Sequence, residues 1–306
     1  MTEDHGTTSA GMSADVESDR PLLMSVCYRL LGSVSEAEDA VQEAYARWYT
    51  LPGADRSEIA SPTGWLITTA SRISLDVLTS ARVKRQTYVG DWLPELVPPP
   101  AQWTTLTASG MNADPADRMT IDESVSMALL VVLESMTPAE RVAFVLHDVF
   151  GYPFGDIGDI VGRSPQACRQ LASSARRRVR MSRTKPADPA EHGRVVVAFK
   201  AAWETGDVAS LVQLLDPEST AITDGGGLVS AATAPVRGAE AIANFLLDVR
   251  TRQPDLDVTV TDVNGQDGLV ASSQGRTLAV IAVAVKEERI DTIWVLRSPL
   301  KLRAWS

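Results

Sequence analysis

The 306-residue chain is poor in the side chains that most often bind transition metals, since it has two cysteines and three histidines. Cys27 and Cys168 lie far apart in apolar helical stretches, where a small buried side chain is the expected role. None of these residues shows a spacing typical of a metal site. We therefore expect no bound metal.

The sequence also lacks an apolar run of membrane-spanning length and a signal peptide, which predicts a cytoplasmic protein without membrane contact. Its net charge of −10 argues against general nucleic-acid binding. Charge is segregated, however: residues 163–185 hold eight basic side chains and no acidic one. Residues 186–306 hold sixteen acidic and eleven basic side chains, a balance of −5. This asymmetry predicts a local basic face beside acidic surfaces.

Residues 151–171 have the pattern of a helix, a sharp turn and a second helix. Gly162 is suited to the left-handed conformation that ends a helix, and Ser164 followed by Pro165 is suited to begin the next one. A second helix that continues into a basic tail is typical of major-groove binding by a helix-turn-helix. Three residues are expected to share its inward face: Ala167, Leu171 and Ala175.

Five segments follow one another along the chain. Residues 1–17 are a polar tail that we expect to be disordered, and residues 18–87 are helical throughout. Residues 88–120 form a proline-containing linker, and residues 121–185 are helical again. Residues 188–306 begin with helices and continue with strands, which predicts an α+β domain.

Local signals refine this division. Ser35 with Glu38, and Thr137 with Glu140, have the spacing of capping boxes at helix starts. Residues 51–63 are expected to form a loop. Residues 256–261, 278–285 and 290–296 alternate with period two, which predicts strands that carry helices on one face of a curved sheet.

The two helical segments resemble regions of bacterial sigma factors. Residues 32–44 and 64–76 are similar to sigma region 2, and residues 133–144 with the helix-turn-helix are similar to region 4. No region 3 lies between them, which is the layout of extracytoplasmic-function (ECF) sigma factors. Residues 188–306 resemble the SnoaL fold, a cone-shaped α+β barrel. The fold class implied is multidomain, with two all-α sigma domains and one α+β SnoaL-like domain.

The resemblance implies core RNA polymerase and promoter DNA as partners. The side chains implied at the −35 element lie on the recognition helix: Arg163, Ser164, Gln166, Ala167, Arg169, Gln170, Arg176 and Arg177. Those implied at the −10 element lie on the helix from residue 64: Arg72, Asp76, Arg82, Lys84 and Arg85. Those implied at the polymerase lie on an acidic helix face: Asp39, Gln42 and Glu43. Trp65 is aromatic enough to stack on a base, but its spacing favours a core position.

A subgroup of these sigma factors carries a Trp-Leu-Pro-Glu-Pro motif in the linker and an Asp-Gly-Gly-Gly motif in the extension. The first motif corresponds to Trp92, Leu93, Pro94 and Glu95. The second corresponds to Asp224, Gly225, Gly226 and Gly227. Leu96 replaces the last proline, and residues 298–302 match a third motif, Asn-Pro-Asp-Lys-Leu, only in part. We predict a regulatory contact between the first two motifs, so that no separate anti-sigma factor is required.

Two other functions stay open from the residues alone. One is a helix-turn-helix regulator that acts without polymerase, and the other is a SnoaL-type enzyme fused to a DNA-binding module. Against the enzyme, no histidine follows His192 in the chain and the carboxylates gather at turns. We expect no catalytic residue and no cofactor, and a small ligand in the last domain stays open.

Overall fold

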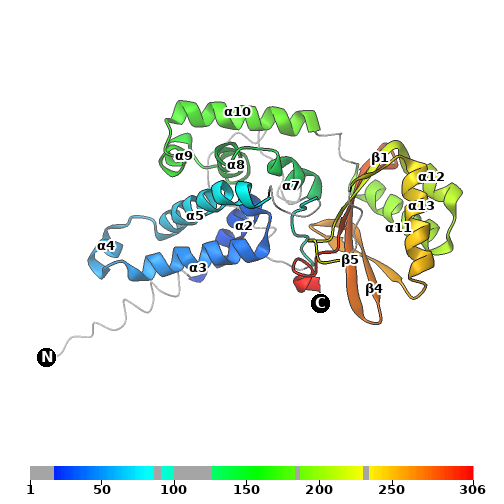
Figure 1. Cartoon of the computed structure of the whole chain (residues 1–306). Coiled ribbons are helices and arrows are strands. Elements are labelled where there is room, and N and C mark those ends of the chain that lie inside the picture. The colour runs from blue at the N-terminus through cyan, green and yellow to red at the C-terminus, as the bar shows by residue number, and fades with distance from the viewer. Residues whose placement is uncertain (1–16, 86–90, 100–125, 183–186, 230–233, 306) are drawn as a thin grey trace. The chain divides into compact units, whose positions relative to one another are not determined.

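The computed structural model describes residues 17–85, 91–99, 126–182, 187–229 and 234–305, except for the side chains of residues 81–85 (Figure 1). These residues form two compact units, which are described separately. Of the described residues, unit 1 contains 17–82 and 133–178, and unit 2 contains 83–85, 91–99, 126–132, 179–182, 187–229 and 234–305. The two predicted sigma regions thus share one unit, and the linker belongs with the C-terminal domain.

Unit 1 begins with helices that follow one another closely: α2 (Arg20–Leu31), α3 (Val34–Thr50), α4 (Gly53–Glu58) and α5 (Pro62–Arg85). The capping box predicted at Ser35 and Glu38 is wrong. Gly32 is left-handed and turns the chain at once, so that Ser33 is the N-cap and accepts from the Glu36 N–H at 3.3 Å. The predicted loop 51–63 is also wrong in part, because it contains α4.

The second half of unit 1 contains the end of α7 (Met127–Glu134), α8 (Pro138–Phe144), the π-helical turn η3 (Val145–Val149), α9 (Phe154–Val161) and α10 (Pro165–Ser182). Arg141 of α8 is buried and donates to the carbonyl oxygen of Leu30 on α2 at 2.9 Å. It also pairs with Glu134 at 2.7 Å. Burial lowers the pKa of Arg141 to about 9. This guanidinium therefore joins the two helical regions in one core.

The expected burial of both cysteines is confirmed, since Cys27 and Cys168 are fully buried in unit 1. Burial raises the pKa of the Cys27 thiol to about 12. A thiol with so high a pKa stays protonated at neutral pH, which fits a packing role.

Unit 2 is built on one six-stranded sheet with the order β2-β1-β6-β5-β4-β3. The strands are β1 (Leu215–Asp224), β2 (Val236–Arg237), β3 (Asp257–Val263), β4 (Gln266–Ser273), β5 (Arg276–Lys286) and β6 (Arg289–Leu296). Among the described strands, β1 and β6 pair in parallel and the other neighbours pair antiparallel. The sheet is open, with β2 and β3 at its edges, and does not close into the barrel that the resemblance implied.

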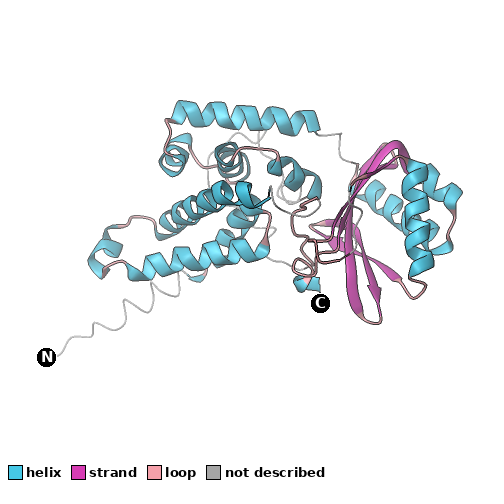
Figure 2. Ribbon diagram, viewed as in Figure 1, coloured by secondary structure: helices cyan, strands magenta, loops and turns pink. Residues whose placement is uncertain are grey.

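Three helices cover one face of this sheet, as Figures 1 and 2 show: α11 (Pro189–Thr205), α12 (Val208–Leu214) and α13 (Ala239–Arg252). Along β5, Ala279, Ile281 and Val283 pack on that helix-covered face. Val280 and Ala282 pack in a second apolar core on the opposite face. Residues 278–285 thus form a strand, as predicted, and this strand is apolar on both faces. A strand that is apolar on both faces needs a second cover.

Candidate nucleic-acid interface and linker clasp

The helix-turn-helix of unit 1 is confirmed by its turn. Gly162 is left-handed with φ 69° and closes α9, and Ser164 accepts from the Ala167 N–H at 3.2 Å at the start of α10. Gly158 also has a role in the turn, because the backbone of Arg163 and Pro165 leaves no space for a side chain there. An added Cβ there would lie 2.7 Å from the Arg163 carbonyl oxygen. A larger residue at position 158 would therefore push the two helices apart.

The solvent face of α10 carries most of the side chains predicted to contact the −35 element. The exposed ones are Arg163, Ser164, Gln166, Arg169, Gln170 and Arg177. Ala167 is half-buried. The buried face is made by Cys168, Ala172, Ala175 and Val179. The predicted burial of Ala175 is therefore confirmed, whereas Ala167 and Leu171 are half-buried and the fully buried residues are their neighbours Cys168 and Ala172. Helical spacing predicts the position of the buried face only approximately. Packing against the rest of unit 1 determines that Cys168 and Ala172 are the residues buried there.

Arg176 differs from its neighbours on α10. Its Nε donates to the buried carboxylate of Asp148 at 2.5 Å, and only 24% of its side chain is exposed. An arginine that neutralises a buried carboxylate is needed inside the protein. The structure thus directs Arg176 toward η3, away from the other residues predicted at the −35 element. Arg169 stays exposed, with its guanidinium carbon 5.4 Å from the ring centroid of Phe154.

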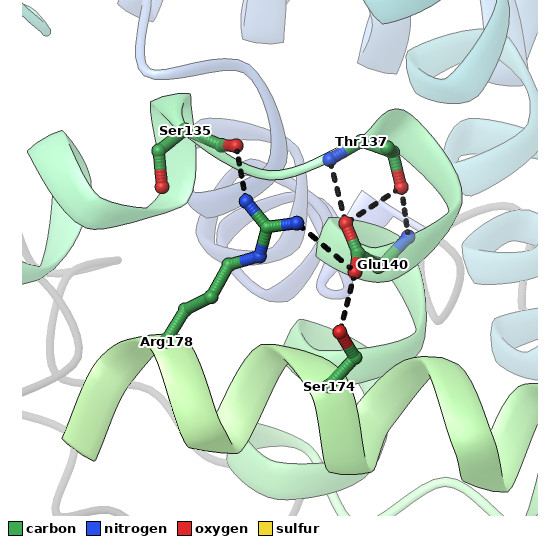
Figure 3. Close-up of polar contacts among 5 residues, drawn as sticks. All are labelled: Ser135, Thr137, Glu140, Ser174 and Arg178. Carbon is green, nitrogen blue, oxygen red and sulfur yellow. Dashed lines mark hydrogen bonds and ion pairs between the residues drawn. The ribbon is translucent and has the colours of Figure 1, made fainter. Parts of the chain in front are cut away.

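A buried carboxylate fixes α10 to the start of α8 (Figure 3). Glu140 forms the predicted capping box with Thr137, and its other oxygen accepts from the Ser174 hydroxyl at 2.8 Å. Arg178 lies 3.6 Å from that oxygen and donates to the Ser135 carbonyl oxygen at 3.1 Å. Burial opposes ionisation of Glu140, but these hydrogen bonds and the Arg178 charge together lower its pKa. The charged carboxylate therefore holds the recognition helix in position.

The residues predicted at the −10 element lie on α5. Arg72 and Asp76 are exposed, and Arg72 donates to the Asp159 carbonyl oxygen at 2.9 Å. Arg82, Lys84 and Arg85 belong to α5, but their side chains lie outside the described residues. Trp65 is half-buried and its ring centroid lies 5.3 Å from that of Trp48, in keeping with the expected core position.

Residues from both predicted DNA-binding faces line one hollow of about 640 Å³ in unit 1. Asp76 and Thr79 of α5 line it together with Arg163 and Arg178. The residues predicted at the polymerase, Asp39, Gln42 and Glu43, are exposed on α3. Glu43 also pairs with Arg47 one turn later at 2.8 Å. Their exposure leaves this face of α3 accessible to a partner.

In unit 2, the linker motif lies against the sheet face that the helices leave uncovered. Leu93 and Leu96 are buried in the core with Trp294, Leu296 and Leu302. Pro94 is also buried, and Glu95 is half-buried. The linker thus supplies the second cover that the two-sided apolar strand β5 requires.

Asp224 joins this linker to the C-terminal end of the chain. Its side chain is fully buried and accepts from the Leu93 N–H at 3.0 Å and from Lys301 Nζ at 2.7 Å. Lys301 also donates to the Leu93 carbonyl oxygen at 2.5 Å, and its Nζ lies 4.2 Å from the Trp92 ring centroid. The two predicted motifs therefore meet, with Lys301 between them.

The glycine loop gives Asp224 a further hydrogen bond. The Gly226 N–H donates to the other carboxylate oxygen at 2.9 Å. Gly226 and Gly227 both have positive φ, 65° and 69°, so two successive left-handed residues turn the chain here. Such a pair is costly for residues with a Cβ, which explains the glycines. Gly225 is buried and Gly227 is exposed.

Backbone pairing extends the contact beyond Asp224. Asn264 accepts from the Val97 N–H through its side chain at 2.6 Å and donates its own N–H to the Val97 carbonyl oxygen at 3.2 Å. Trp305 donates its indole N–H to the Leu96 carbonyl oxygen at 2.8 Å. We call residues 92–97 with Asp224, Asn264, Lys301 and Trp305 the linker clasp. Asn264, Lys301 and Trp305 were not predicted from the sequence, although the partial motif at 298–302 includes Lys301.

Comparison with known proteins decides the family. Models of sigma-70 region 2, sigma-70 region 4 and the SnoaL-like domain match residues 16–83, 126–179 and 196–297. The "ECF RNA polymerase sigma factor SigJ" of Mycobacterium tuberculosis is 38% identical over 305 residues, covering 94% of this chain and 92% of that protein. The chain is an ECF RNA polymerase sigma factor. The "Probable ECF RNA polymerase sigma factor SigI" of the same species is 35% identical over 293 residues, covering 95% of this sigma factor and 94% of that protein.

The crystal structure of Mycobacterium tuberculosis SigJ has the same architecture. It superposes with a TM-score of 0.74 at 34% identity and covers 95% of this sigma factor and 98% of SigJ. The expected fold class of two helical sigma regions and a SnoaL-like helix-and-sheet domain is thereby confirmed, with an open sheet in place of a barrel. In the part of this sigma factor that the structure describes, no helix has the length and apolarity needed to cross a membrane.

Proposed function

We propose that this sigma factor brings core RNA polymerase to promoters with two elements, and that the linker clasp regulates this step. The −35 element is contacted by the exposed face of α10: Arg163, Ser164, Gln166, Arg169, Gln170 and Arg177. Ala167 borders that face, and Arg176 supports it from inside. The observation that carries this proposal is that α10, the second helix of a complete helix-turn-helix, has a basic and exposed face.

The −10 element is contacted by α5, through Arg72, Asp76, Arg82, Lys84 and Arg85. Asp39, Gln42 and Glu43 on α3 dock on a basic polymerase surface. Support comes from the exposure of Arg72 and Asp76 and of the three α3 residues, from the match to sigma-70 region 2 and from the relatives' names as RNA polymerase sigma factors. The protein acts in the cytoplasm, where polymerase and promoter DNA are found.

The two DNA-binding faces must separate before they bind a promoter. Elements near −35 and −10 are about 25 base pairs apart, on the order of 85 Å at about 3.4 Å per base pair. Asp76 and Arg163, in contrast, line one hollow in unit 1. Opening requires loss of contacts such as Arg72 to Asp159 and Arg141 to Leu30. The free protein therefore holds a conformation that cannot engage both elements.

The linker clasp controls the segment that connects the two DNA-binding regions. Residues 92–97 lie between α5 and α7 in the chain, and the clasp fixes them on the C-terminal domain. This domain therefore limits how far the regions can separate, which makes a separate anti-sigma factor unnecessary. In this proposal the domain acts as a regulator, in line with the relatives that match the whole chain, which are named as sigma factors.

Run-off transcription with core polymerase, on a promoter that the protein selects from a random library, tests both parts of the proposal. Arg169→Ala should cost about 1–3 kcal/mol and relax the preference at one base position. Arg177→Ala should weaken all sequences evenly and reduce the salt slope by about one. Asp224→Asn, which loosens the clasp, should change transcript yield without loss of polymerase binding. Equal yields from Asp224→Asn and the unaltered protein would refute the regulatory part alone.

A further inference from the structure

Unit 2 contains a cavity of about 570 Å³ between α13 and the helix-covered face of the sheet. Most of its lining is apolar and includes Trp203, Phe245 and Ile281. Sites for small organic molecules typically have volumes of about 300–1,000 Å³ and an apolar lining with a few polar groups. The size and lining of this cavity therefore suit a small organic ligand.

The charged side chains that line the cavity are both arginines. They are Arg252 at the end of α13 and the half-buried Arg297, and the described lining includes no carboxylate and no imidazole. Arg252 pairs with Asp248 at the exposed surface. Burial lowers the pKa of Arg297, and the positive charge of Arg252 lowers it further. The cavity thus has the half-buried guanidinium of Arg297 in its lining and the exposed Arg252 near it, and guanidinium groups favour an anionic ligand group at this end.

We propose that this cavity binds an apolar organic carboxylate and that binding is linked to the linker clasp. The hydrocarbon or aromatic body lies among Trp203, Phe245 and Ile281. The carboxylate accepts hydrogen bonds from Arg297, whose planar fork can bind it in a bidentate manner, and Arg252 adds charge at the same end. Among the described lining residues the polar groups are suited to hold a ligand, which favours binding over acid–base catalysis.

The link to the clasp is short. Thr223 and Arg297 line the cavity, and Asp224 follows Thr223 at the end of β1. The backbone N–H groups of Arg297 and Ser298 donate to the Asp224 carbonyl oxygen at 2.8 and 3.0 Å. A carboxylate held by the Arg297 side chain therefore acts on the backbone that carries the clasp aspartate. This second step rests on the proposed function of the clasp, whereas the binding site does not.

Calorimetric titration of the full chain with decanoate, decanol and decyltrimethylammonium tests the site. We expect decanoate to bind at least tenfold more tightly than decanol, and the cation to bind most weakly. Arg297→Met should reduce decanoate affinity at least tenfold, down to that of decanol. Arg297→Lys should retain part of the preference, and Arg276→Met, at an exposed arginine outside the lining, should retain all of it. Arg252→Met provides a second test if Arg297→Met does not fold.

Equal affinity for decanoate and decanol, or unchanged decanoate affinity in both Arg297→Met and Arg252→Met, would overturn the site. Hydrogen exchange at the Leu93 amide then tests the link, because Leu93 N–H binds Asp224 directly. Saturating decanoate should change this exchange rate severalfold, and Asp224→Asn should change decanoate affinity by up to the same factor, since coupling is reciprocal and the full factor requires a fully open clasp. Decanoate binding with no change at Leu93 would overturn the link. Neither measurement uses transcription. A failure of the proposed function in the transcription assay can therefore be distinguished from a failure of the ligand site or of its link to the clasp.

Discussion

Glu140 and Asp224 are both buried carboxylates that accept several hydrogen bonds, yet they organise the chain in different ways. Glu140 is held by Thr137, Ser174 and Arg178, all from the region that contains the helix-turn-helix. Asp224 is held by Leu93 and Lys301, which lie 131 residues before and 77 residues after it. The first site therefore stabilises one region internally, whereas the second makes the position of a connecting segment depend on a separate domain.

The largest effect is expected from Asp224→Ala. It leaves the nearly buried Lys301 ammonium without its carboxylate partner, and breaking a buried pair in this way costs about 3–5 kcal/mol. Hydrogen exchange at the Leu93 and Val97 amides should become faster by about a hundredfold or more. Glu140→Ala should leave both amides unchanged. Unaltered exchange in Asp224→Ala would mean that apolar contacts alone hold the linker.

The apolar part of the clasp can be separated from the Asp224 part by Leu96→Ala. Leu96 is 1% exposed, and removing a buried leucine side chain costs about 2–5 kcal/mol. Limited proteolysis should then cut residues 91–99 at a raised rate. Leu228→Ala serves as a control, because Leu228 is 62% exposed beside the glycine loop and should change little. Similar proteolysis of the two variants would contradict the burial of Leu96 in solution.

At the Glu140 site, Glu140→Gln should destabilise unit 1 by about 1–3 kcal/mol, because buried partners lose a charged acceptor. The hydrogen bonds and the Arg178 charge hold the pKa of Glu140 below its usual value of 4.5. Its stabilising effect is therefore present above pH 4.5 and is lost as the pH falls through the lower folded value. Thermal melts at pH 7 and pH 3 should show a difference between the variant and the original protein that shrinks on acidification. Glu38→Gln, at an exposed position on α3, is the control.

The smallest effect is expected from the contact between Trp92 and Lys301. A cation 4.2 Å from a ring centroid contributes about 0.5–2 kcal/mol. A double-mutant cycle with Trp92→Ala and Lys301→Met, followed by exchange at Leu93, should give a coupling in that range. Strictly additive changes would show that Trp92 contributes through burial alone.

The structure could be predicted from the sequence where the contacts that determine it join residues close together along the chain. Gly162, Ser164 and the Thr137–Glu140 capping box lie within one turn of the helices that they end or begin, and the helix-turn-helix followed from them. The start of α3 was misplaced by two residues because Ser33 and Ser35 offer competing caps, and the conformation of Gly32 decides between them. Propensity alone does not make that choice.

Contacts between residues far apart in the sequence could not be predicted from local sequence patterns. The basic run around Arg176 predicts DNA binding, yet Asp148 pairs with this arginine from 28 residues away. The role of Lys301 was not predicted because its motif matches only in part. The role of Asn264 was not predicted because Asn264 followed by Gly265 has the pattern of an ordinary hairpin turn. Each of these roles depends on which distant segment packs against the residue. Composition and spacing do not specify that segment.

The two-sided strand β5 has a consequence for any transfer of the C-terminal domain to another protein. A domain transferred with residues 188–306 alone would present Val280, Trp294 and Leu296 without their cover from Leu93 and Leu96. The inherited unit must therefore include the linker, even though sigma region 4 lies between the two in the gene. Recombination within this architecture is constrained to exchange both segments together, and changes in Leu96 and in the sheet residues beneath it should accompany one another during evolution.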